Sequence, residues 1–192
     1  MIDTIQVLGS LEKCLSELCS EDVDSSCKEG TLAAALHGYY NQVGLKAGWL
    51  KPEYATPLSE QDEVNKRKNI LAAQDVLCYW KVRFEERDEE ERSQLVEAME
   101  RSVDYEAHRG EVLLEAASNS QHRQWQRFVE EFQKERITPG HPKYRPANHQ
   151  QYQASYQDLS EEEKDQDRLV VAVITDMVLA RAIPEYERRI KV

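Results

Sequence analysis

The residues best suited to bind a ligand gather between positions 125 and 156, around a loop rich in proline and aromatic residues. Aromatic side chains there could wall a pocket, and Arg side chains at its mouth could pair with an anionic group. This combination suits an anionic ligand with a flat ring system, such as a nucleotide. Alternatively, the aromatic residues close the core beneath the loop and the cations are solvated. The residues that we predict to bind the ligand are Trp125, Arg136, His141, Tyr144, Arg145, Tyr152 and Tyr156.

Two acidic runs form a second set of chemically distinctive residues. Each run lies at or near the start of a predicted helix, where the helix dipole favours carboxylates, so the runs could simply cap helices. Because the chain has a formal net charge of −11, they could also dock on a basic partner surface. The predicted partner contacts are Glu85, Glu86, Glu89, Glu90, Glu91, Glu161 and Glu162.

Catalytic and metal-binding motifs are missing from the sequence. It contains no Gly-rich phosphate loop, no nucleophile elbow and no zinc-binding helix motif. His141 and His149 are eight positions apart, but a metal site would need a third ligand such as Asp158 or Glu161. Exposed loop histidines are the simpler interpretation. We therefore predict a protein that is not an enzyme and that uses no metal or cofactor.

The composition predicts a helix-rich, cytoplasmic chain. Of its 192 residues, 40% are hydrophobic and 32% are charged, with few glycines and prolines. Only residues 101–150 are not acidic, which argues against direct nucleic-acid binding. We find no secretion signal and no apolar run of the roughly 18 residues needed to cross a membrane, so no membrane association is expected. The cysteines show neither CxxC pairing nor zinc-finger spacing, which indicates free thiols in a reducing compartment.

Apolar residues recur every three or four positions along most of the chain, which predicts helices. Helices are expected over 2–20, from a Thr31 cap to about 43, and through a stripe that includes Leu77 and Trp80. Between residues 88 and 136, successive apolar residues are on average one helical turn apart, about 3.6 positions. An unbroken helix there would be about 70 Å long, so we expect a break at Gly110 or at residues 118–120.

The last segment begins with Ser160 and Glu163, spaced as a capping box, and should be helical to about Arg189. Its β-branched run at 169–174 could form a strand, but nothing else offers a pairing strand, so we predict a buried helix. The predicted fold is therefore an all-α compact bundle of five or six helices with one long Pro- and Tyr-containing loop, residues 137–158. Residues 1–50 would form an N-terminal helical pair and 51–192 the main body of one cooperative domain. The predicted core residues are Leu77, Trp80, Trp125 and Phe128.

One segment resembles a known family. His141-Pro142, followed by Tyr156-x-x-Leu159-x-x-Glu162-Glu163-Lys164-x-x-Asp167-Arg168, resembles the second half of ryanodine-receptor-type (RyR) domains, which also occur in small bacterial and phage proteins. The similarity covers residues 125–168, with Trp125 in place of the family's early tryptophan. It departs from the pattern at Ser155, where a proline is usual, and in the position of the His-Pro pair. The resemblance implies a binding or scaffold module with a nucleotide-like ligand.

Two functions are consistent with these observations. The first is a small acidic, non-enzymatic protein-interaction module of the cytosol, such as a phage or bacterial inhibitor or regulator that docks on a basic partner. The alternative is an RyR-like module that binds a nucleotide-like small ligand. The two differ in whether Tyr144, Arg145 and Tyr156 surround a concave pocket.

Overall fold

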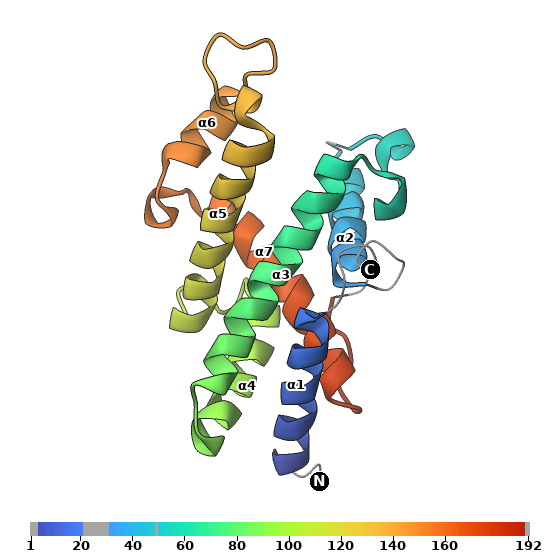
Figure 1. The fold of residues 1–192 in the computed structure, drawn as a ribbon, viewed down its shortest axis with the longest axis vertical. Helices are drawn as coiled ribbons and strands as arrows, with labels where there is room; N and C mark the ends of the chain where they lie inside the picture. The colour runs from blue at the N-terminus through green and yellow to red at the C-terminus, as the bar shows by residue number, and fades with distance from the viewer. Residues whose placement is uncertain (1–3, 21–30, 49, 191–192) are drawn as a thin grey trace.

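The computed structural model describes residues 4–20, 31–48 and 50–190, and within them all regular structure is helical (Figure 1). The all-α prediction is confirmed, with seven α-helices in these ranges rather than five or six. The additional helix is α6, which starts at Pro146 inside the segment predicted to be a loop. The helices are α1 (Thr4–Cys19), α2 (Leu32–Ala47), α3 (Glu63–Glu85), α4 (Glu89–Val103), α5 (Val112–Phe132), α6 (Pro146–Gln153) and α7 (Glu161–Ala182).

Helix α7 is the centre of the bundle. It packs against α1, α2, α3, α4 and α5, and Figure 1 shows it passing between them. All residues from Leu169 to Leu179 are buried, so the β-branched run is a helix surrounded by other helices, as predicted. The predicted capping box is also present, because Ser160 and Glu163 each bond the other's backbone N–H.

The hydrophobic core lies mainly around α3 and α7. The indole of Trp80 is fully buried, and its Nε1–H donates a hydrogen bond to Thr175 Oγ1 of α7 at 2.8 Å. Leu77 and Phe128 are buried as predicted. Trp125 is only half-buried, so its assignment to the core is wrong. Its indole ring instead lines a cleft between helices.

The predicted break in the long helical segment occurs at Gly110. Helix α4 ends at Val103, a turn follows, and α5 begins at Val112. Gly110 has φ of +88°, a left-handed conformation that glycine adopts without the steric cost of a Cβ. The alternative break at residues 118–120 is not used, because those residues are helical within α5.

Helix α7 ends at Ala182 rather than near Arg189, and Pro184 prevents its continuation. The following tail folds back over Asp176, a fully buried carboxylate of α7. Asp176 accepts hydrogen bonds from Tyr186 Oη at 2.8 Å and from the backbone N–H groups of Arg189 and Ile190 at 3.0 and 3.2 Å. These bonds satisfy the carboxylate and fix the tail against the bundle.

Two further properties concern the described residues. No helix among them combines the length and the apolar character that crossing a membrane requires. Cys14, Cys19 and Cys78 form no disulfide bond with one another, and Cys27 lies outside the described ranges.

Candidate ligand-binding cleft

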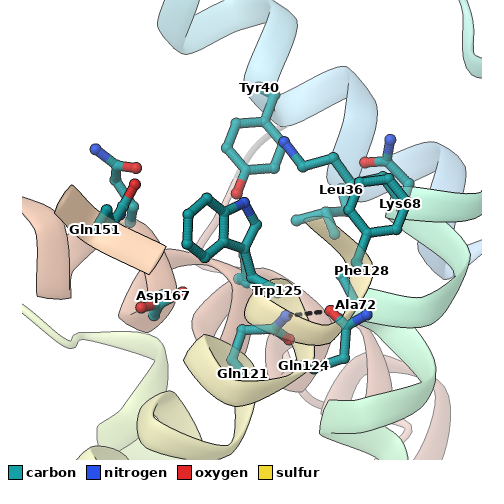
Figure 2. Close-up of a pocket in the computed structure, with 13 residues that line it drawn as sticks. Leu36, Tyr40, Lys68, Ala72, Gln121, Gln124, Trp125, Phe128, Gln151 and Asp167 are labelled. Carbon is teal, nitrogen blue, oxygen red and sulfur yellow. Dashed lines mark hydrogen bonds between the residues drawn. The ribbon is translucent and has the colours of Figure 1, made fainter. Parts of the chain in front are cut away.

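A cleft lies between α2 and α3 on one side and α5, α6 and α7 on the other (Figure 2). It has two adjoining parts, which we name the inner lobe, of about 100 Å³, and the outer lobe, of about 540 Å³. Residues from α2, α3 and α7 line both lobes, so the lobes lie side by side. These shared residues are Tyr40, Lys68, Asn69 and Gln166.

Aromatic rings wall the inner lobe. Trp125 of α5 lies at the centre of Figure 2, with Tyr40 of α2 beside it. The ring of His122 stacks on Trp125, with centroids 5.8 Å apart and planes at 23°, which supports the indole from one turn earlier on α5. The ammonium group of Lys68 lies 5.8 Å from the centre of the Tyr40 ring. The inner lobe therefore combines stacking surfaces with one cation.

Amide side chains supply most of the polar surface of the inner lobe. Gln121 is 3% exposed and donates a hydrogen bond from Nε2 to Gln124 Oε1 at 3.1 Å. Its own Oε1 is buried without a hydrogen-bond partner. The amides that line the lobe are Asn69, Gln121, Gln124, Gln151 and Gln166. Each can both donate and accept, so the lobe can bind a polar group of either type.

Asp167 of α7 is the carboxylate of the inner lobe and is 8% exposed. Its Oδ2 lies 3.4 Å from His122 Nδ1, longer than a good hydrogen bond, and neither buried atom has another partner. The Nε2–H of His122 donates to the carbonyl of Ala154 at 3.1 Å. Asp167 Oδ2 therefore faces His122, and like Gln121 Oε1 it is sealed from the open part of the lobe.

The electrostatics of this pair follow from burial and neighbouring charges. Burial raises the pKa of Asp167, while His122, Arg168 and Lys68 oppose the shift. Burial disfavours protonation of His122, but Asp167 and the Ala154 carbonyl outweigh it, so the pKa of His122 is raised. For Asp167, burial outweighs these neighbouring charges, so the pKa of its carboxyl group stays above the ordinary value.

The predicted ligand-binding residues are not brought together. Trp125 lines the cleft, but the other six do not. Tyr156 is buried against α5 and donates from Oη to Glu115 Oε2 at 2.7 Å. Tyr144 Oη lies 2.8 Å from His149 Nδ1. Tyr152 is half-buried, and exposed side chains are found at Arg136, His141 and Arg145.

All seven predicted partner contacts are exposed, but several have partners within the chain. Glu91 closes a capping box with Asp88 at the start of α4. Glu161 bonds Arg168 Nη1 at 2.8 Å, and Glu85 lies 3.7 Å from Lys81. The first run spans the end of α3 and the start of α4, whereas the second begins α7, whose start lies apart from that turn in Figure 1.

Arg168 is the centre of a buried ionic cluster next to the cleft. It is 2% exposed, and its Nε and Nη2 donate to Glu115 at 2.9 and 3.0 Å. Its Nη1 donates to Glu161 and Asp165, both at 2.8 Å. These bonds join the start of α7 to α5 and fix the orientation of the turn that carries Asp167.

Four cleft residues were not predicted from the sequence: Tyr40, Lys68, Gln121 and Asp167. One signal was available, because Asp167 lies only two positions before the most apolar run of the chain, where burying a carboxylate costs free energy unless it has a partner. A scan against protein-family models, a search of curated proteins and a search of solved structures found no match for this chain. The resemblance to RyR domains stays a prediction.

Proposed function

We propose that this chain is a binding module whose cleft takes a small, flat, anionic ligand of the nucleotide type. The observation that supports this function is the aromatic wall of the inner lobe, where the rings of Trp125 and Tyr40 lie beside Lys68. Aromatic faces stack on flat ring systems, and an ammonium group can pair with an anion.

The two lobes match the two ends of such a ligand. Pockets for drug-sized molecules measure roughly 300–1,000 Å³. The inner lobe, at about 100 Å³, can hold only one end of a ligand, while the outer lobe, at about 540 Å³, can hold the rest. Lys68 lines both lobes and in its protonated form can pair with an anionic group, although burial and the nearby Arg136 lower its pKa.

Binding accounts for these residues better than catalysis does. A carboxylate with a shifted pKa inside a cleft also suits acid–base chemistry. However, the side chains that line the inner lobe beside Asp167 are amides, aromatic rings, aliphatic groups and Lys68. No Ser, Thr or Cys is among them to act as a nucleophile with Asp167 as its base.

A titration with nucleotides tests this proposal. We expect at least one of AMP, GMP, CMP and UMP to raise the melting temperature of the intact chain, because a ligand at 100 times its Kd stabilises by about 2.7 kcal/mol. Trp125→Leu should weaken binding about tenfold or more, since base stacking on an aromatic ring is worth roughly 1–3 kcal/mol. Tyr144→Leu, a half-buried aromatic outside the cleft, is the control. If none of the four nucleotides shifts the melting curve, the proposal is wrong.

A second candidate function is docking on a basic partner protein. The observation that favours it is that the exposed side chains of Glu89 and Glu90 have no ion-pair partner among the described residues. Their carboxylates are therefore available to a partner, unlike that of Glu91.

Charge reversal would test docking. Glu89→Lys with Glu90→Lys should slow association with a partner isolated from the native cell, and the effect should fade at 1 M salt, where the Debye length is about 3 Å. Glu130→Lys with Glu131→Lys changes the charge equally at exposed positions of α5 and serves as control. Equal association rates for both double variants at low salt would remove the first acidic run from the interface.

A further inference from the structure

We propose that Cys19 and Cys78 form a site of reversible oxidation, where a peroxide closes a disulfide bond between α1 and α3. Cys19 is the last residue of α1, and Cys78 lies in the second half of α3. Neither residue lines the cleft, so this inference is independent of the proposed function.

The packing of α1 on α3 places the two thiols together. Leu18 and Leu77, the residues directly before the two cysteines, line the same small cavity of about 20 Å³. The side chain of Cys19 also packs against the hydrophobic core. A hydrogen bond joins the thiols of Cys19 and Cys78, so their sulfur atoms are neighbours. A disulfide bond of about 2.05 Å therefore requires only a short approach of the two side chains.

The position of Cys19 at a helix end makes this approach easier. The last carbonyl groups of an α-helix have no partner within the helix, so a small shift of the last residue breaks few hydrogen bonds. Cys78 is followed by seven more residues of α3 and is held in place by the helix on both sides. We therefore expect the end of α1 to move toward α3 when the bond forms.

The two thiols differ in exposure, which divides their roles. Cys78 is exposed, so a peroxide can reach its sulfur atom. Cys19 is partly buried, and burial together with the neighbouring Cys78 raises the pKa of its thiol to about 11. Because the thiolate is the reactive form, Cys78 reacts first with the oxidant and Cys19 completes the bond. The positive charge of Lys81, one turn further along α3, lowers the pKa of Cys19 and so assists this second step.

The reaction is a two-electron oxidation with hydrogen peroxide as the oxidant. The thiolate of Cys78 attacks one peroxide oxygen, the O–O bond breaks, and the hydroxide that leaves takes up a proton to become water. The product is a sulfenic acid at Cys78. The sulfur of Cys19 then attacks the sulfenic sulfur, loses its proton and displaces a second water. Two thiols and one peroxide thus give one disulfide and two waters, and thiol–disulfide exchange with a reductant reverses the reaction.

The other two cysteines are the competing partners. Cys14 is buried, and its Sγ–H donates to the carbonyl of Val178 in α7 at 3.9 Å. It lies five positions before Cys19, which places the two side chains about 140° apart around α1, so they cannot pair while the helix is intact. Cys27 lies outside the described residues, so a variant without it is needed to test its part.

Oxidation of the intact, reduced chain with stoichiometric hydrogen peroxide tests the proposal. The thiols titrated after denaturation should fall from the four of the sequence to two, and dithiothreitol should restore them. Peptide mapping without reductant should find Cys19 joined to Cys78. This bond should form at least about tenfold faster in native buffer than in guanidinium chloride, because the fold holds the thiols at a high effective concentration.

Two serine variants serve as controls. Cys27→Ser should form the same bond as the wild type, whereas Cys78→Ser, a change at an exposed position, should leave Cys19 as a thiol. Four thiols after oxidation, a bond from Cys78 to Cys27, or a disulfide-linked dimer would each overturn the proposal. Equal rates in native buffer and in guanidinium chloride would also overturn it, because the folded structure would then not be what pairs the two residues.

Discussion

Replacing Trp80 by alanine should lower the free energy of unfolding by about 3–5 kcal/mol, the range for a large buried aromatic residue. The indole is 0% exposed, packs edge-on against Tyr79 with centroids 5.1 Å apart, and donates to Thr175 Oγ1 of α7. The substitution removes this contact between α3 and the central helix and leaves a cavity. Denaturant unfolding followed by circular dichroism measures the loss.

Val82→Ala is the control for Trp80→Ala, because Val82 lies two positions further along α3 and is 45% exposed. Its cost should stay within about 0.5 kcal/mol, as for most surface substitutions. A loss below about 1 kcal/mol in Trp80→Ala would show that the contact between α3 and α7 does not hold the core together.

Replacing Arg168 by methionine should cost about 3 kcal/mol at neutral pH. Breaking a buried ion pair by removing one partner is strongly destabilising, and here Glu115 and Asp165 would lose their main buried cation. The value lies at the low end of the usual range because these carboxylates are partly exposed and can be hydrated. Equilibrium unfolding in urea measures the cost.

The free energy of unfolding of Arg168→Met should fall less at acidic pH than that of the wild type. Burial opposes ionisation of Glu115 and Asp165, but their bonds to arginine outweigh it, so the pKa of each carboxyl is lowered in the folded protein. Such groups contribute stability above their unfolded pKa values, about 4, which is lost as the pH falls through the folded values. The stability difference between wild type and Arg168→Met should therefore shrink below about pH 4. Arg109→Met, which removes an exposed partner of Asp165, should cost far less than Arg168→Met, because solvent screens the exposed pair.

The elements of this fold that sequence reasoning predicted well are those with strong local signals. The capping box at Ser160, the Thr31 cap and the break at Gly110 depend on a few adjacent residues, and the structure contains all three. The helical state of residues 169–174 followed from the lack of any pairing strand. Helix α6 was missed because its residues are mostly polar and show no apolar period, although proline at its first position is a known start signal.

The cleft could not be predicted in the same way. Tyr40, Trp125 and Asp167 come from three helices that are far apart along the chain and meet only through packing around α7. Nearness in sequence instead pointed to the tyrosines of the 137–158 segment. Those tyrosines have separate neighbours, because Tyr156 bonds Glu115 whereas Tyr144 pairs with His149.

The position of α7 has a consequence for synthesis of the protein on the ribosome. Helices α1 to α5 all pack against α7, and the ribosome synthesises α7 after all of them. At about 5–20 residues per second, translation from the end of α5 to the end of α7 takes roughly 3–10 s. During that time the nascent chain holds five helices whose apolar faces have no common partner. Chaperone binding or ribosome stalling should therefore change the yield of folded protein most strongly while the segment between the end of α5 and the end of α7 is being translated.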